Sequence, residues 1–215
     1  MGRTFTSFEA GERTYPVLSA SQRDQLNRIA PSIDGALRYF PCCVRLRVGQ
    51  LVDRVYLVEA QSYISVWGVW PDQDAHKHEV KIEDVVEIFE SPTRMPVNFA
   101  NELYRAGESG MGYTVFTMRF RDGSEHAVAT GNAIDFVPFP AGQTAADIIE
   151  VVPHHGHARA VDSTQPYYWC IYGSGKPHAA EQAVAADRHA SSRARRMCVI
   201  SVCTRAAHQA AARCR

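Results

Sequence analysis

The sequence lacks the features of a membrane or secreted protein. No apolar run approaches the roughly eighteen residues that a membrane-spanning helix needs. The first thirteen residues have no apolar core of the kind found in a secretory signal, and no Asn-x-Ser/Thr glycosylation acceptor occurs. We therefore expect a soluble, cytoplasmic protein that has no membrane partner.

The cysteines do not form a recognisable disulfide framework. The chain has six, but Cys42 and Cys43 are adjacent, and Cys198, Cys203 and Cys214 lie near the C-terminus in a segment of unusual composition. A domain of about 150 residues buries enough surface to be stable without disulfides. We expect Cys42 and Cys43 to be reduced and partly buried.

The last 42 residues contain no Phe, Tyr or Trp, whereas twelve are Ala and seven are Arg. They hold eight Lys and Arg against two Asp and Glu, so this segment is basic and the preceding 173 residues carry a net charge of −6. The composition divides the chain into an irregular arm (1–14), a single α+β domain (15–172) and a disordered or loosely helical basic tail (173–215). The acidic domain disfavours a specific nucleic-acid partner.

A β-hairpin is predicted between residues 114 and 130. Two runs of strand-forming residues flank Arg121-Asp122-Gly123-Ser124. Asp-Gly between such runs is a strong hairpin signal, because both residues tolerate the positive φ of a type I′ turn. Phe116, Met118 and Phe120 share one face of the first strand, which we expect to face the core.

The rest of residues 15–172 alternates between helical and extended patterns. We predict helices over residues 21–30, 32–40 and 96–106, with Pro31, Pro41 and Gly107 at their ends. We predict strands over residues 44–48, 55–58, 63–70, 80–90, 135–139 and 147–152, and an edge strand or plug over 166–172. This predicts an α+β fold with a mainly antiparallel, twisted sheet, or a partly open small barrel, and two or three helices.

Histidines supply the candidate metal ligands. In Asp72-Gln73-Asp74-Ala75-His76-Lys77-His78, carboxylates and imidazoles occupy alternate residues, so an extended backbone would point them the same way. Such side chains bind divalent transition metals, and His154 lies in a second histidine cluster beyond the last regular strand. A polar surface loop is the alternative interpretation of both clusters.

The spacing His76-x-His78 followed by Glu83 resembles, in part, the first metal-binding motif of cupins. That resemblance implies a divalent metal held by His76, His78 and Glu83. The second cupin motif would place a histidine after a Pro-x-Gly. Pro140-Ala141-Gly142 is present, but residues 143–147 contain no histidine, so the family is not assigned.

The glycine-rich segment Gly107-Glu108-Ser109-Gly110-Met111-Gly112 follows a predicted helix and precedes a predicted strand. A phosphate-binding loop has the opposite order, with the glycines before the helix N-terminus. A connecting loop is one interpretation, and a loop that presents Glu108 and Ser109 to a ligand is the other.

Two functions follow from these patterns. The first is a non-catalytic binding or protein-interaction domain with no cofactor, because no nucleophile, base and orienting group can be identified together. The second is a metal-binding protein or metal-dependent enzyme that uses His76, His78 and Glu83 or His154, with the metal as Lewis acid.

Overall fold

A computed structural model of the chain describes residues 13–74, 77–131, 133–155, 160–162 and 166–175, with the side chains of 161 and 162 left out. The predicted metal ligand His76 and nearly all of the predicted basic tail lie outside these residues. The chain divides into two units, and the first ends at Ser174. The three α-helices of the described part are α1 (Ala20–Leu26), α2 (Ala60–Trp67) and α3 (Val97–Ala106).

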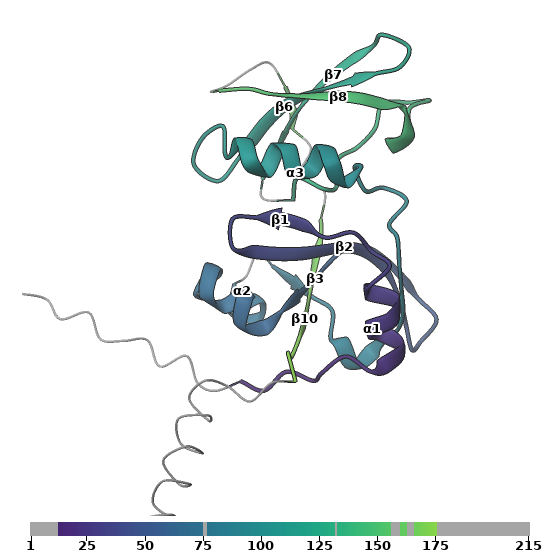
Figure 1. Cartoon of the computed structure of the whole chain (residues 1–215), viewed down its shortest axis with the longest axis vertical. Coiled ribbons are helices and arrows are strands. Elements are labelled where there is room, and N and C mark those ends of the chain that lie inside the picture. Colours follow the sequence, from purple (N-terminus) through teal and green to yellow (C-terminus); the bar gives the residue numbers. More distant parts are fainter. Residues whose placement is uncertain (1–12, 75–76, 132, 156–159, 163–165, 176–215) are drawn as a thin grey trace, which may run out of the picture. The chain divides into compact units, whose positions relative to one another are not determined.

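The described strands form two sheets (Figure 1). The six-stranded sheet has the order β1-β2-β3-β10-β4, and β5 also pairs with β2. Its strands are β1 (Ser32–Asp34), β2 (Leu37–Leu46), β3 (Leu51–Glu59), β4 (His78–Glu79), β5 (Val85–Phe89) and β10 (Tyr168–Tyr172). The four-stranded sheet has the order β8-β6-β7-β9. Its strands are β6 (Thr114–Phe120), β7 (Glu125–Thr130), β8 (Ile148–Pro153) and β9 (Val161–Asp162).

The predicted α+β class is confirmed. Most strand pairs are antiparallel, although β10 runs parallel to β3 and β4, and β9 runs parallel to β7. The sheets do not close into a barrel in the part of the chain that the structure describes. No helix there is long and apolar enough to cross a bilayer.

The six-stranded sheet is buried on both faces. Alternation along β3 puts Tyr56 and Val58 on one face, and Val55 and Leu57 on the other. The first face shares its hydrophobic core with α2, α3 and the four-stranded sheet, whereas the second packs against the region of α1 through residues that include Leu26. One continuous core therefore joins the two sheets.

The predicted hairpin is confirmed. β6 and β7 pair from Thr114↔Thr130 to Arg119↔Glu125, and Phe116, Met118 and Phe120 are fully buried. The turn type differs from the prediction, because only Gly123 has a positive φ, at 85°. The Phe120 N–H donates to the Ser124 carbonyl and the Gly123 N–H to the Phe120 carbonyl, which is the three-residue loop with a glycine bulge.

Three other predicted elements are confirmed with shifted ends. α3 begins one residue after Pro96 and ends at Ala106, just before Gly107, whose φ is 81°. α1 begins earlier than predicted, because Ser19 accepts from the Gln22 N–H as its N-cap, and it ends at Leu26. The strand predicted over 80–90 is the shorter β5, preceded by a 3-10 helix at Ile82–Asp84.

The helix predicted over residues 32–40 is wrong. β1 and β2 form a hairpin there, with Asp34 opposite Leu37 and Gly35-Ala36 as the loop. Gly35 has a φ of 56°, which a helix does not accept and a glycine adopts without steric cost. The apolar residues in this segment are spaced as in a helix. Gly35 nevertheless favours a turn, and the pairing of β1 with β2 stabilises the hairpin.

The strand predicted over residues 63–70 is also wrong, because residues 60–67 form α2. The Glu59 carboxylate accepts from the backbone N–H groups of Gln61 and Ser62 and caps the helix, and Gly68 ends it with a φ of 66°. The core-facing residues follow helical spacing, and they are Ala60, Tyr63, Ile64 and Trp67.

Two further predictions need correction. Residues 135–139 do not form a strand, and their only ladder contact in the described part is a bridge between Phe136 and Arg94. The segment predicted as an edge strand or plug is β10, an inner strand between β3 and β4. Its apolar residues are buried on both faces, which explains the near-continuous apolar sequence from Tyr167 to Tyr172.

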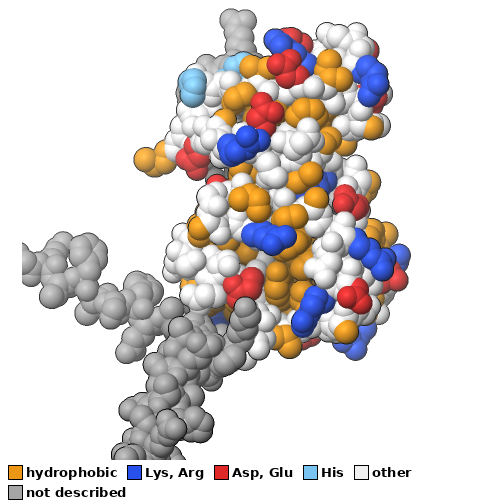
Figure 2. All heavy atoms as spheres, viewed as in Figure 1, with side chains coloured by type: hydrophobic (Ala, Val, Ile, Leu, Met, Phe, Trp, Pro, Cys, Tyr) orange, Lys and Arg blue, Asp and Glu red, His pale blue; other side chains and the backbone are white. Residues whose placement is uncertain are grey.

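Charged side chains of both signs are interspersed with apolar ones on the face seen in Figure 2. Neither sign gathers over one element on that face. The described residues on this face therefore present no broad basic surface of the kind that recognises a phosphate backbone.

Candidate functional site

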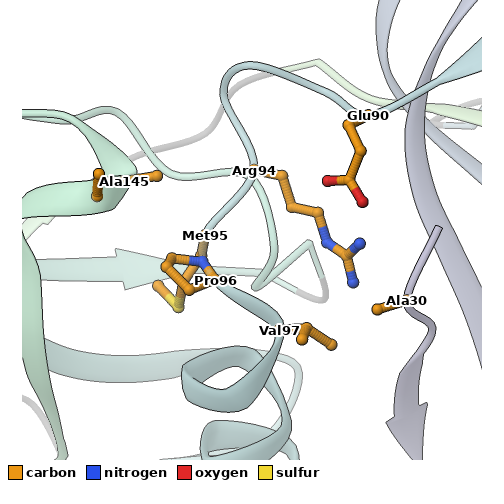
Figure 3. Close-up of a pocket in the computed structure, with 8 residues that line it drawn as sticks. Ala30, Glu90, Arg94, Met95, Pro96, Val97 and Ala145 are labelled. Atoms are coloured by element: carbon orange, nitrogen blue, oxygen red, sulfur yellow. The ribbon is translucent and has the colours of Figure 1, made fainter. Parts of the chain in front are cut away.

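A pocket of about 160 Å³ opens where α3 begins (Figure 3). Its lining comes from segments far apart in the sequence: the end of the α1–β1 connection, the loop between β5 and α3, the first residue of α3, and the 3-10 helix Ala145–Asp147. The lining residues are Ala30, Glu90, Arg94, Met95, Pro96, Val97, Ala145 and Ala146. The walls are therefore mainly apolar, with one cationic and one anionic side chain.

The loop between β5 and α3 is shaped by its prolines. Pro96 has φ −54° and ψ 134°, so it directs the chain into the first turn of α3 without being helical itself. No described side chain caps this helix, and the N–H groups of Val97 and Asn98 have no acceptor in the described part of the chain. These groups give the helix start a partial positive charge.

Arg94 is buried, with 6% of its surface exposed, although it lines the pocket. Its Nη2 donates to Ser32 Oγ at 3.1 Å, and its Nε lies 3.6 Å from Asp135 Oδ1. The Nε–H is buried and has no hydrogen-bond acceptor in the described residues. In Figure 3 the guanidinium extends toward Glu90, Ala30 and Val97.

Asp135 is the centre of a buried polar network behind the pocket. One carboxylate oxygen accepts from Ser32 Oγ and the other from Tyr104 Oη, at 2.7 Å, and from Tyr56 Oη, at 3.3 Å. The Asp135 backbone carbonyl accepts from the Met95 N–H at 2.8 Å. The network joins α3, β1, β3 and the segment after β7, so it holds the wall of the pocket in place.

Burial raises the pKa of Asp135, which has no exposed surface, against the opposing effects of the Arg94 guanidinium and the three hydroxyl donors. Burial and the Asp135 charge raise the pKa of both Tyr56 and Tyr104 well above the ordinary value. Both phenols therefore remain protonated donors.

The predicted metal ligands that the structure describes lie on or next to different elements. His78 is exposed on β4, Glu83 is exposed on the 3-10 helix before β5, and His154 follows β8. His154 Nε2 and Thr117 Oγ1 are 2.7 Å apart and share a hydrogen bond. No three metal-ligating side chains gather among the residues that the structure describes, and because His76 is outside them, the metal hypothesis stays a prediction.

The predicted ligand-facing side chains Glu108 and Ser109 form hydrogen bonds within their own loop. Glu108 Oε2 accepts from the Gly112 N–H at 2.9 Å. Ser109 Oγ accepts from the Val115 N–H at 2.7 Å and donates to the Val115 carbonyl. These contacts stabilise the turn into β6, and a role in ligand binding stays a prediction.

The sequence analysis did not identify Arg94 or Asp135. Composition could have identified Asp135, which is the one charged residue in the apolar run from Ala133 to Phe139. A carboxylate in such a run is buried only when it has hydrogen-bonding or charged partners. Arg94 lies between Pro92 and Pro96, where the sequence predicts only a break in regular secondary structure. No protein-family model, curated protein or solved structure matches the chain.

Proposed function

We propose that the chain is a non-catalytic binding domain that holds a small ligand in the pocket at the start of α3. The observation on which this rests is Arg94, a charged residue that lines the pocket although 94% of its surface is buried. Ser32 and Asp135 hold this guanidinium from the core side, and a polar group that is already fixed in position favours ligand binding.

The pocket lining supports recognition in preference to chemistry. Apolar walls with a few oriented polar groups are typical of ligand sites. The volume of about 160 Å³ is below the roughly 300–1,000 Å³ of sites for drug-sized molecules, so the ligand is small. The chain would serve as a cytoplasmic receptor or carrier of a small molecule, and the free thiols of Cys42, Cys43 and Cys170 are in keeping with a reducing compartment.

A pocket-filling variant tests this function. Ala145→Leu places a larger side chain in the pocket wall, and Ala141→Leu makes the same change at an exposed residue outside the lining. A library of small polar metabolites is screened by thermal shift against wild type and both variants. We expect compounds that stabilise wild type and Ala141→Leu to lose their effect on Ala145→Leu. Equal stabilisation of all three proteins by every active compound would place binding elsewhere and refute the proposal.

A further inference from the structure

We propose that aromatic side chains of α2 form a second binding site, which accepts the trimethylammonium group of a small quaternary ammonium compound. In the structure the ammonium group of Lys77 lies in this site, as an internal substitute for the ligand. The site uses none of the residues that line the pocket at the start of α3, so the inference goes beyond the proposed function.

Two aromatic rings of α2 face the Lys77 ammonium group. Nζ lies 4.3 Å from the centre of the Trp67 ring and 5.6 Å from the centre of the Tyr63 ring. Both distances are within the roughly 6 Å over which the face of a ring attracts a cation. Nζ also donates to Tyr63 Oη at 3.2 Å and lies 3.5 Å from Asp74 Oδ2. The two rings and the carboxylate therefore form a cage for one positive charge.

Other aromatic rings hold the cage in position. Trp70 stacks on Tyr63, with 6.3 Å between the ring centres. Trp169 meets Tyr63 and Trp67 edge to face, with ring centres 5.0 and 5.9 Å away. Tyr63 and Trp169 are almost completely buried. A site whose rings are already fixed loses little conformational entropy when a ligand binds.

The charges around the cage favour a cationic ligand. Burial raises the pKa of Tyr63, and the negative charges of Asp74 and Glu79 add to this effect, so both carboxylates act on this ring. In the described part of the chain, the Lys77 ammonium group is the one cation over the Tyr63 or Trp67 ring. When this group leaves, the ring faces and the carboxylates attract an external cation.

A trimethylammonium group suits this cage better than lysine does. The lysine ammonium group is strongly hydrated and has three N–H donors. Its contact with Asp74 is longer than an ordinary hydrogen bond. A trimethylammonium group has no N–H to satisfy, and aromatic cages recognise this group. The Lys77 side chain keeps 11% of its surface exposed, so the cage reaches the protein surface and a ligand can replace the lysine.

An NMR titration of wild type tests whether a ligand displaces Lys77. The chain has three lysines, Lys77, Lys81 and Lys176, and reductive methylation with isotope-labelled formaldehyde labels each one and keeps its charge. We expect the Lys77 methyl resonance to lie upfield of that of exposed Lys81, because it lies over the Trp67 ring. Choline should move it toward the Lys81 position. A Lys77 resonance that stays in place throughout the titration overturns the proposal.

A variant without the internal cation tests the cage itself. Calorimetry compares choline with its neutral analogue, in which a tert-butyl group replaces the trimethylammonium group. Lys77→Ala should bind choline at least about tenfold more tightly than wild type, because wild-type affinity is reduced by the fraction of cages that Lys77 occupies. Lys81→Ala is the matched control and should bind as wild type does.

The neutral analogue tests the role of the charge. It should bind Lys77→Ala at least about tenfold more weakly than choline does, because only choline gains the attraction between a cation and the rings. Equal affinity of wild type and Lys77→Ala for choline, or of the variant for choline and its analogue, overturns the proposal. If Lys77→Ala does not fold, the NMR titration of wild type decides.

Discussion

Asp135 combines complete burial with four polar partners, and its ionisation couples the fold to pH. Burial raises its pKa above the ordinary value of about 3.9. A raised pKa in the folded state means that protonation favours folding. The contribution is fully present below about pH 3.9 and is lost as the pH rises through the raised pKa, by about 1.4 kcal/mol for each unit of elevation.

The variant Asp135→Asn isolates this contribution. We expect the difference in free energy of unfolding, wild type minus variant, to fall as the pH increases from 4. The reason is that only the wild type has to ionise a buried carboxyl group. Denaturant unfolding at several pH values measures it. Asp122→Asn is the control, because hydrogen bonds from Ser124 lower the pKa of exposed Asp122. The same difference in free energy should therefore rise with pH for this variant. A wild-type advantage at Asp135 that grows with pH would show that Arg94 outweighs burial.

The two tyrosines that donate to Asp135 differ in geometry, and this predicts different energies. Tyr104 Oη is 2.7 Å from Asp135 Oδ2, and Tyr56 Oη is 3.3 Å from the same atom. Tyr104→Phe should cost about 1.5 kcal/mol of stability and Tyr56→Phe about 0.5 kcal/mol, because the longer hydrogen bond is weaker. Urea denaturation at neutral pH measures both, and the reverse order would contradict the network described here.

Elements with distinct turn and cap chemistry could be predicted from the sequence, and elements that depend on tertiary pairing could not. Asp122-Gly123 identified the β6–β7 hairpin. Asp34-Gly35 is a similar hairpin signal. The helical spacing of the neighbouring apolar residues led to the prediction of a helix instead, whereas Gly35 adopts a positive φ in the β1–β2 hairpin. In α2, alternation over residues 63–70 obscured a better helical spacing.

The helical state of α2 gives a prediction at the element scale. Val66 is 49% exposed on α2, and Val86 is 43% exposed on β5. Val66→Ala should raise the free energy of unfolding by about 0.5 kcal/mol, because Ala has the higher helix propensity. The same substitution at Val86 should lower it, because β-branched residues favour strands. Chemical denaturation of both variants measures the effect, and a loss of stability at Val66 would favour the strand predicted from alternation.

At the scale of the whole molecule, the pocket could not have been predicted. Its lining residues are separated by up to 116 positions, from Ala30 to Ala146, and converge because one hydrophobic core joins the two sheets. The sequence indicated the α+β class, because the two-residue period of strands and the 3.6-residue period of helices are local properties of the sequence. It did not indicate that Arg94 and Glu90 would line one pocket, because that depends on the packing of both sheets.

The central claim is that the pocket at the start of α3 binds a small ligand. An NMR titration of the isotope-labelled full chain with the compounds that stabilise it in the thermal-shift screen tests it most directly. We predict saturable shifts that are largest at the backbone amides of Val97 and Asn98, and smaller shifts in Ala145→Leu at equal ligand concentration. Shifts that centre on His78 or His154, or that leave Val97 and Asn98 unchanged at saturation, would contradict it.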